Sequence, residues 1–342
     1  MNTRIDPDDV RFFSGQSNPG LAAAIAYYLG VPLESTRFQR FTNDNMRIQL
    51  GASVRGRAVF IVQSLVPPVS ERLVELLMML DIARSAAAQE VHAIIPYYSY
   101  ARSDKKDAPR ISITARLIAD LLETAGATHI MTMQLHSPQV HGFFRVPTDP
   151  LTARGLFTDY LLHKPDLQNT KAIVVAPDAG SAKSAARFAS QLGLPIAVAN
   201  KTRISDTAVR VSDMLRNQVK GYQCAIIYDD EIATGGSMVE LCEQFAKSDI
   251  EQICLICTHG LFVGNAIERL TAFPQVKEII TTDTVPIPPE KRIPIMTVLS
   301  VASVFGEAIR RNHLRMSIGS LFTFGEEEMP GEDGGSKNAD QS

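Results

Sequence analysis

Short apolar runs alternate with longer amphipathic stretches along most of the chain. Residues 58–63, 91–96 and 129–133 are almost continuously apolar, which is typical of strands buried on both faces. Between them, residues 70–88 and 114–124 carry apolar side chains at helical spacing. Strands and helices in alternation predict a mainly parallel sheet flanked by helices on both faces.

The alternation starts again after a stretch rich in turn residues at 147–150. Helices are expected at 181–192 and 236–248. Strands are expected at four ranges, namely 172–176, 196–199, 224–228 and 252–258. The restart predicts a second α/β lobe.

We therefore expect an N-terminal α/β domain at 1–150 and a C-terminal α/β domain at 151–312. Residues 313–324 should form an ordered segment that packs back on the first lobe. The remaining residues, 325–342, are rich in Gly, Glu, Asp and Ser and are expected to be disordered.

Composition and charge narrow the classes of partner. The chain has 342 residues, of which 45% are hydrophobic and 21% are charged, enough for a sizeable core in each of two domains. Its net charge is −3, from 34 Lys and Arg against 37 Asp and Glu. That balance argues against nucleic-acid or membrane-surface binding. We find no signal peptide pattern and no apolar run of membrane-spanning length.

The cysteines bear on the compartment. Cys254 and Cys257 have a spacing that fits a redox or metal site, but no second pair of ligands with such spacing is present. Their apolar neighbours favour buried thiols in a strand instead. A cytoplasmic, reducing compartment is the expectation that follows.

The strongest local motif is the segment 225–237, in which an apolar strand is followed by Asp229 and Asp230. Carboxylates of this kind accept hydrogen bonds from vicinal sugar hydroxyls. The small-residue turn that follows opens a helix, whose N-terminal N–H groups bind phosphate. An ordinary glycine turn with acidic residues near a helix start is the alternative. The combination favours a phosphorylated pentose, held by Asp229, Asp230, Thr234, Gly235, Gly236 and Ser237.

Two charged loops follow other predicted strands. The loop after 91–96 alternates cations and acids and is expected to contact a triphosphate, although such a loop is often only a solvated surface; its candidates are Arg102, Ser103, Asp104 and Lys105. Lys201 and Arg203 follow the strand at 196–199. They are either surface cations or a clamp that stabilises charge on a transferring diphosphate.

His136 and Asp178 each stand just past a strand. Taken alone, His136 is a structural histidine and Asp178 a turn residue or helix cap. Together they fit a metal–nucleotide site, because Mg²⁺ needs few protein contacts and prefers oxygen ligands.

These loops, in this order, resemble those of class I ribose-phosphate diphosphokinases (5-phosphoribosyl 1-diphosphate synthetases). The similarity runs from about Arg11 to Phe322, and as an ordered set its landmarks are highly specific. They include 12–15, 41–43, 53–56, 101–107, 135–136, 139–144, 177–180, 258–260 and 307–311.

The resemblance implies two phosphoribosyltransferase-like domains, Mg²⁺ dependence, and transfer of the diphosphate of ATP to ribose 5-phosphate. It implies that His136 and Asp178 are metal-associated, that Lys201 and Arg203 are catalytic, and that Asp229 lies in the ribose-5-phosphate site. The ATP site would include Arg102, Ser103 and the neighbouring subunit's Phe41, Asn43 and Asn45.

The resemblance also implies assembly. Members of the family pair subunits to complete each ATP site and associate into hexamers, so a homo-oligomer is expected. The sequence alone favours a Phe41 that fills its own domain's core in the hairpin-like segment 37–50, and the resemblance reverses this preference. Phosphate and ADP regulate class I relatives between subunits, and Arg55, Arg110 and Ser317 stand at matching positions, whereas Gly319 replaces a hydroxyl residue.

The chain departs from the family pattern at four further positions. Ser103 stands where the family usually has Gln, and acids are usual at the positions of Asn45, Gln134 and Ala233. The departures leave three hypotheses. The chain is a diphosphokinase acting on ribose 5-phosphate, a diphosphokinase acting on a related ribose-5-phosphoryl acceptor, or a non-catalytic regulatory paralogue.

Overall fold

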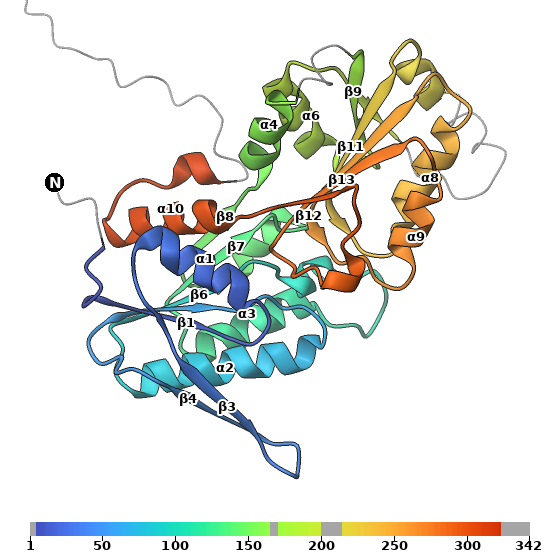
Figure 1. Ribbon diagram of the computed structural model, residues 1–342. Helices are drawn as coiled ribbons and strands as arrows, with labels where there is room; N and C mark the ends of the chain where they lie inside the picture. Colours follow the sequence, from blue (N-terminus) through green and yellow to red (C-terminus); the bar gives the residue numbers. More distant parts are fainter. Residues whose placement is uncertain (1–4, 165–169, 200–213, 323–342) are drawn as a thin grey trace, which may run out of the picture.

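The computed structural model describes residues 5–164, 170–199 and 214–322, and all structural statements below concern these residues. They form two six-stranded sheets, each wholly parallel, and a separate two-stranded hairpin (Figure 1). The predicted fold class, with two mainly parallel sheets flanked by helices, is therefore confirmed.

The first sheet has the strand order β2-β1-β5-β6-β7-β8. The apolar run predicted at 58–63 forms its central strand β5, which is buried at every position. The other strands are β1 (Val10–Ser14), β2 (Leu33–Glu34), β6 (Glu90–Ile95), β7 (His129–Met133) and β8 (Thr148–Leu151), and β5 spans Ala58–Val62. Helices α2 (Val69–Ser85) and α3 (Thr114–Ala125) and the 3-10 turns η1 (Ser99–Arg102) and η2 (Pro138–Phe143) follow the inner strands.

The second sheet has the order β10-β9-β11-β12-β13-β14. Its strands are β9 (Ala172–Ala176), β10 (Ile196–Val198), β11 (Cys224–Ile232), β12 (Gln252–Gly260), β13 (Val276–Thr282) and β14 (Met296–Leu299). Its helices are α4 (Arg154–Leu162), α6 (Ala182–Leu192), α8 (Gly236–Phe245) and α9 (Ala266–Thr271), and η3 (Pro289–Lys291) precedes the last strand.

One apolar core joins the two sheets. Phe60 of β5 and Phe188 of α6 belong to the same cluster of buried side chains. The opposite faces have cores of their own, under α2 and α3 in the first sheet and under α8 and α9 in the second. Because the shared core ties one sheet to the other, loops from both sheets are held at fixed positions along their seam (Figure 1).

The end of the chain returns to the first sheet. Helix α10 (Ala302–His313) lies against α1 (Pro19–Leu29), and η4 (Gly319–Leu321) follows it. The Leu321 carbonyl accepts a hydrogen bond of 3.1 Å from the Thr152 amide. The two helices approach closely at Gly306, where an added Cβ would come within 2.2 Å of the Tyr28 ring. A larger residue at Gly306 would therefore force α1 and α10 apart.

Two expectations about local structure were wrong. The stretch at 147–150 is not a turn but leads into strand β8, where Pro150 pairs in register with Thr132. Proline is tolerated there because β8 is an edge strand of the sheet. Strand β11 also continues past Tyr228 to Ile232, because its outer residues pair with β12 as far as Gly260. The acidic residues of the motif thus lie within the strand.

The four cysteines are free and buried, and Cys254 and Cys257, for which buried thiols were predicted, lie inside strand β12. None of the helices in the described ranges combines the length and apolar character that spanning a bilayer requires.

Candidate active site

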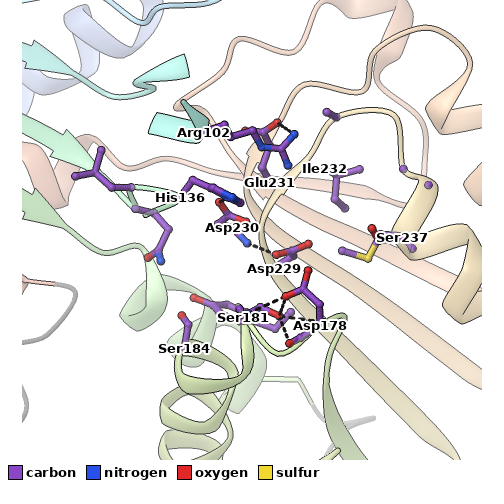
Figure 2. A pocket seen from close by; sticks show the side chains of 18 of the residues that line it. Arg102, His136, Asp178, Ser181, Ser184, Asp229, Asp230, Glu231, Ile232 and Ser237 are labelled. Carbon is purple, nitrogen blue, oxygen red and sulfur yellow. Dashed lines mark hydrogen bonds and ion pairs between the residues drawn. The ribbon is translucent and has the colours of Figure 1, made fainter. Parts of the chain in front are cut away.

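A cleft of about 780 Å³ lies where the carboxyl ends of the two sheets face each other. It is lined by η1, by the loops that follow β7 and β9, by α6, and by the end of β11 with the start of α8 (Figure 2). Ligands bind at the carboxyl ends of parallel strands in such folds, because the connecting loops converge there.

The predicted sugar-phosphate loop forms one wall of this cleft. Gly235 precedes α8 with φ +73°, a left-handed conformation that glycine adopts without steric strain. Helix α8 begins at Gly236, and its first residues line the cleft together with Thr234. A phosphate at this end would meet free N–H groups and the positive end of the helix dipole.

Asp229 and Asp230 lie side by side at the end of β11. Asp230 accepts a hydrogen bond of 2.7 Å from Nδ1 of His136, which comes from the other sheet (Figure 2). That bond raises the pKa of His136. Burial opposes ionisation of Asp230, but the hydrogen bond and charge of His136 prevail and lower its pKa to about 2. This hydrogen bond therefore bridges the two sheets.

Asp229 has the opposite electrostatic environment. Burial, and then the neighbouring Asp230, raise the pKa of Asp229 well above its usual range. The repulsion is relieved when a cation or hydrogen-bond donor reaches the site. Such a carboxylate is suited to accept hydrogen bonds from a sugar hydroxyl.

Asp178 takes part in the turn that leads into α6. Its Oδ1 accepts hydrogen bonds from the amide and the hydroxyl of Ser181, at 3.0 and 3.2 Å. This is the turn role that the sequence left open for Asp178, and Ser181 is the N-cap of α6. The same residue also lines the cleft, as His136 does, so the structure brings the two predicted metal-associated residues to one site.

The predicted nucleotide loop reaches the cleft through Arg102. Its guanidinium Nη1 lies 3.4 Å from Oε1 of Glu231, whereas Asp104 accepts a hydrogen bond from Ser137. Lys105 is exposed, and Ser103 is partly buried beside α3. Among the four loop candidates, Arg102 is thus the one that lines this cleft.

The hairpin that carries Phe41, Asn43 and Asn45 projects away from the cleft (Figure 1). It consists of β3 (Thr36–Arg40) and β4 (Met46–Leu50), paired antiparallel. The Phe41 amide donates to the Asn45 carbonyl at 2.9 Å, and the Phe41 side chain is 44% exposed. Phe41 therefore does not fill its own domain's core.

The remaining predicted residues lie elsewhere. Lys201 and Arg203 are outside the described residues. Arg55, Arg110 and Ser317 are exposed, and none of the three is among the residues that line the cleft. Their proposed regulatory role stays a prediction.

One departure from the family pattern takes up local partners, and another leaves space in the cleft. The Gln134 side chain accepts a 3.1 Å hydrogen bond from Thr152, and its carbonyl contacts Nε2 of buried His259 at 3.1 Å. Burial lowers the pKa of His259 to about 4, so this ring is neutral at pH 7. Ala233 lines the cleft, where its small side chain leaves space beside Thr234.

Sequence reasoning missed several residues that line the cleft. Glu231 directly follows the acidic pair, so three consecutive acids after an apolar run were the signal that pointed to it. Helices α4 and α6 add cationic side chains that carry no comparable motif, namely Arg154, Lys183 and Arg187.

Comparison with known proteins agrees with this geometry. Residues 10–126 match the model of the N-terminal domain of ribose phosphate pyrophosphokinase, and residues 213–323 match the phosphoribosyl synthetase-associated domain. A ribose-phosphate pyrophosphokinase of Deinococcus radiodurans is 46% identical over 327 residues, covering 94% of this chain and all of that protein (100%). One of Caldanaerobacter subterraneus subsp. tengcongensis is 41% identical, covering 92% of this chain and 98% of that protein.

A solved structure is similar over the same extent. The crystal structure of phosphoribosylpyrophosphate synthetase from Mycobacterium smegmatis aligns with a TM-score of 0.81 and 35% identity, covering 90% of this chain and 99% of that one. The matches span both sheets and the cleft between them. The chain belongs to the ribose-phosphate pyrophosphokinase family.

Proposed function

We propose that the chain transfers the diphosphate of ATP to the 1-hydroxyl of ribose 5-phosphate, which yields 5-phosphoribosyl 1-diphosphate and AMP. One observation carries this proposal: the cleft joins a helix N-terminus and two carboxylates on one wall to Arg102 and His136 on the other. The first wall suits a sugar phosphate, and the second suits the phosphates of a nucleotide. Relatives named as ribose-phosphate pyrophosphokinases are 46% and 41% identical over 94% and 92% of this chain.

In the proposed reaction, the 1-hydroxyl oxygen attacks the β-phosphorus of ATP. A new O–P bond forms, the bond from the β-phosphorus to the oxygen of the α-phosphate breaks, and its electron pair leaves with AMP. The hydroxyl proton passes to water. Asp229 and Asp230 orient the ribose through its hydroxyls, and the amides at Gly235 and Gly236 hold its 5-phosphate. Lys201 and Arg203 stabilise the charge that develops on the transferring group.

The residues present fit Mg²⁺ delivered with the nucleotide. The cleft offers carboxylates and the second ring nitrogen of His136, but the described residues form no cluster of three acidic, histidine or cysteine ligands. Such a donor set suits an ion that keeps phosphate and water ligands. We assign its protein contacts to His136 and Asp178. When bound, the ion neutralises charge on the transferring phosphates.

The test of this function is a mixture of the purified chain, Mg²⁺, ATP and ribose 5-phosphate. AMP and 5-phosphoribosyl 1-diphosphate should appear in equal amounts, and omission of the sugar should abolish AMP formation. AMP release only with a larger ribose-5-phosphoryl acceptor would show a related diphosphokinase. If no acceptor in a screen causes AMP release, the chain would be a regulatory paralogue. Either of these two results would contradict the proposal.

We further propose that the active form is a homo-oligomer in which Phe41, Asn43 and Asn45 complete the ATP site of a neighbouring subunit. Its support is the exposed Phe41 on a hairpin directed away from its own cleft (Figure 1). An exposed aromatic ring beside amides suits stacking on adenine. The buried, free thiols favour a cytoplasmic setting for this assembly.

Specific activity is expected to fall on dilution as the assembly dissociates, because each nucleotide site then loses its borrowed hairpin. Light scattering on the same dilution series measures the mass of the particle. A monomer with full ATP-dependent turnover would show that each chain builds its site alone.

A further inference from the structure

Glu231 is a buried carboxylate at the seam of the two sheets. Its side chain is 5% exposed, although it lines the cleft at the end of β11. Burial raises the pKa of this carboxyl. A carboxylate is costly to bury unless it has hydrogen-bonding or charged partners, so its contacts indicate what it does.

Both partners of Glu231 come from the other sheet. The Tyr97 hydroxyl donates to Oε2 at 3.1 Å, and Nη1 of Arg102 lies 3.4 Å from Oε1. Figure 2 shows the carboxylate turned toward the Arg102 guanidinium and not toward Asp229. One carboxylate thus joins the strand of the sugar-phosphate site to the loop of the nucleotide site.

Tyr97 is a rigid member of this contact. The residue is buried, and its ring packs against His259, with the ring centroids 4.9 Å apart. It also shares a small apolar cluster with Val66 and Val285. Burial raises the pKa of the phenol, which therefore remains a hydrogen-bond donor at neutral pH. Glu231 is fixed on one oxygen and presents the other to Arg102.

Arg102 is the flexible member. Its side chain is 51% exposed at the end of η1. A free arginine side chain samples many rotamers and loses that freedom when it binds a phosphate. A carboxylate fixed at one end of the guanidinium reduces this loss before the ligand arrives.

We propose that Glu231, held by Tyr97, is a positioning residue that orients Arg102 toward the phosphates of the nucleotide and thereby couples the nucleotide loop to the sugar-phosphate strand. The inference rests on the proposed function for the identity of the ligand. It adds a residue outside the sugar-phosphate, nucleotide and metal sets assigned above.

The test compares Glu231→Ala, Glu231→Gln and Tyr97→Phe with the unmodified chain. Glu231→Ala should weaken ATP binding on the order of tenfold, because Arg102 loses its charged partner. KM for ribose 5-phosphate should change less than about twofold, because the sugar-phosphate groups are untouched. Glu231→Gln should bind ATP more tightly than Glu231→Ala does. The ATP affinity of Tyr97→Phe should lie between those of Glu231→Ala and the unmodified chain. Glu243→Ala, at an exposed site on α8, is the matched control and should change neither constant.

A double-mutant cycle separates positioning from a general effect on folding. If Glu231 acts through Arg102, Glu231→Ala should add little once Arg102 is alanine. Independent, additive losses, or equal losses in both substrate constants, would overturn the inference.

Calorimetric titration with Mg²⁺ and ATP makes the outcome independent of turnover. A chain that binds ATP but releases no AMP would contradict the proposed function, and loss of affinity in Glu231→Ala would still support the positioning role. Unchanged ATP affinity in Glu231→Ala, or no ATP binding by the unmodified chain, would overturn it.

Discussion

Replacing Lys201 with alanine is expected to lower kcat on the order of a hundredfold or more, the scale on which removal of a transition-state donor acts. KM for ATP and for ribose 5-phosphate should change far less. An interaction that forms only as charge develops on the transferring diphosphate lowers kcat without weakening ground-state binding. The measurement is steady-state kinetics with each substrate varied in turn.

The position of the preceding strand supports this expectation. β10 pairs with β9, and the Ala199 amide donates to the Ala176 carbonyl at 2.9 Å. The chain therefore leaves the described region beside the loop that carries Asp178 into the cleft. Lys247→Ala, at an exposed site beyond α8, is the control and should leave kcat unchanged. Full turnover by Lys201→Ala would refute the catalytic role.

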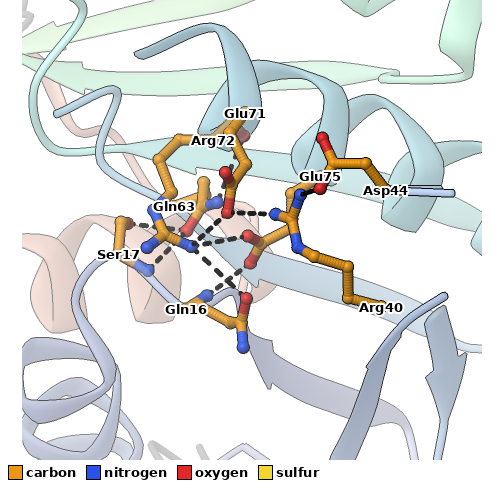
Figure 3. Close-up of polar contacts among 8 residues, drawn as sticks. All are labelled: Gln16, Ser17, Arg40, Asp44, Gln63, Glu71, Arg72 and Glu75. Atoms are coloured by element: carbon orange, nitrogen blue, oxygen red, sulfur yellow. Dashed lines mark hydrogen bonds and ion pairs between the residues drawn. The ribbon is translucent and has the colours of Figure 1, made fainter. Parts of the chain in front are cut away.

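Removing the Glu75 carboxylate is expected to lower the free energy of unfolding by about 3–5 kcal/mol, as when one partner of a buried ion pair is deleted. The Glu75 side chain is fully buried (0% exposed) and lies 2.9 Å from Nη1 of Arg72. It also accepts a hydrogen bond from the Gln16 amide, in the loop after β1 (Figure 3). Glu75→Ala would remove the acceptor of the Gln16 amide and leave Nη1 of Arg72 with only its longer contacts, to Gln16 at 3.4 Å and Glu71 at 4.0 Å.

Glu71 on the same helix provides the control. Its side chain is 31% exposed and lies 2.7 Å from Nη2 of Arg40, the last residue of β3 before the hairpin turn (Figure 3). Glu71→Ala should cost less than about 1 kcal/mol, because exposed pairs are screened by water. Urea unfolding of the two variants measures the difference. Equal losses would show that burial does not set the contribution of the Glu75 contact.

These two glutamates illustrate the limit of pattern reading. Both stand in one helical stretch, and in the sequence Glu75 is simply a charge that interrupts an apolar run. Helical spacing predicts α2, since that periodicity is local. Whether a given turn of α2 faces solvent or the loop after β1 depends on packing between elements distant in sequence.

The sequence by itself determined the alternation of strands and helices, the two lobes of parallel sheet, and the glycine turn that opens α8. Each depends on a local cause: apolar periodicity, or the conformational freedom of Gly235. Only the tertiary structure decided that Pro150 lies in an edge strand. Proline is tolerated there because β8 has a neighbouring strand of the sheet on one side only.

The tertiary structure also decided which charges meet. His136 contacts Asp230 and Arg102 contacts Glu231 across the seam between the sheets, although each pair is distant in the chain. No periodicity encodes such a pairing. It arises because parallel strands place their carboxyl-end loops on one edge, and the core shared by Phe60 and Phe188 brings the two edges together.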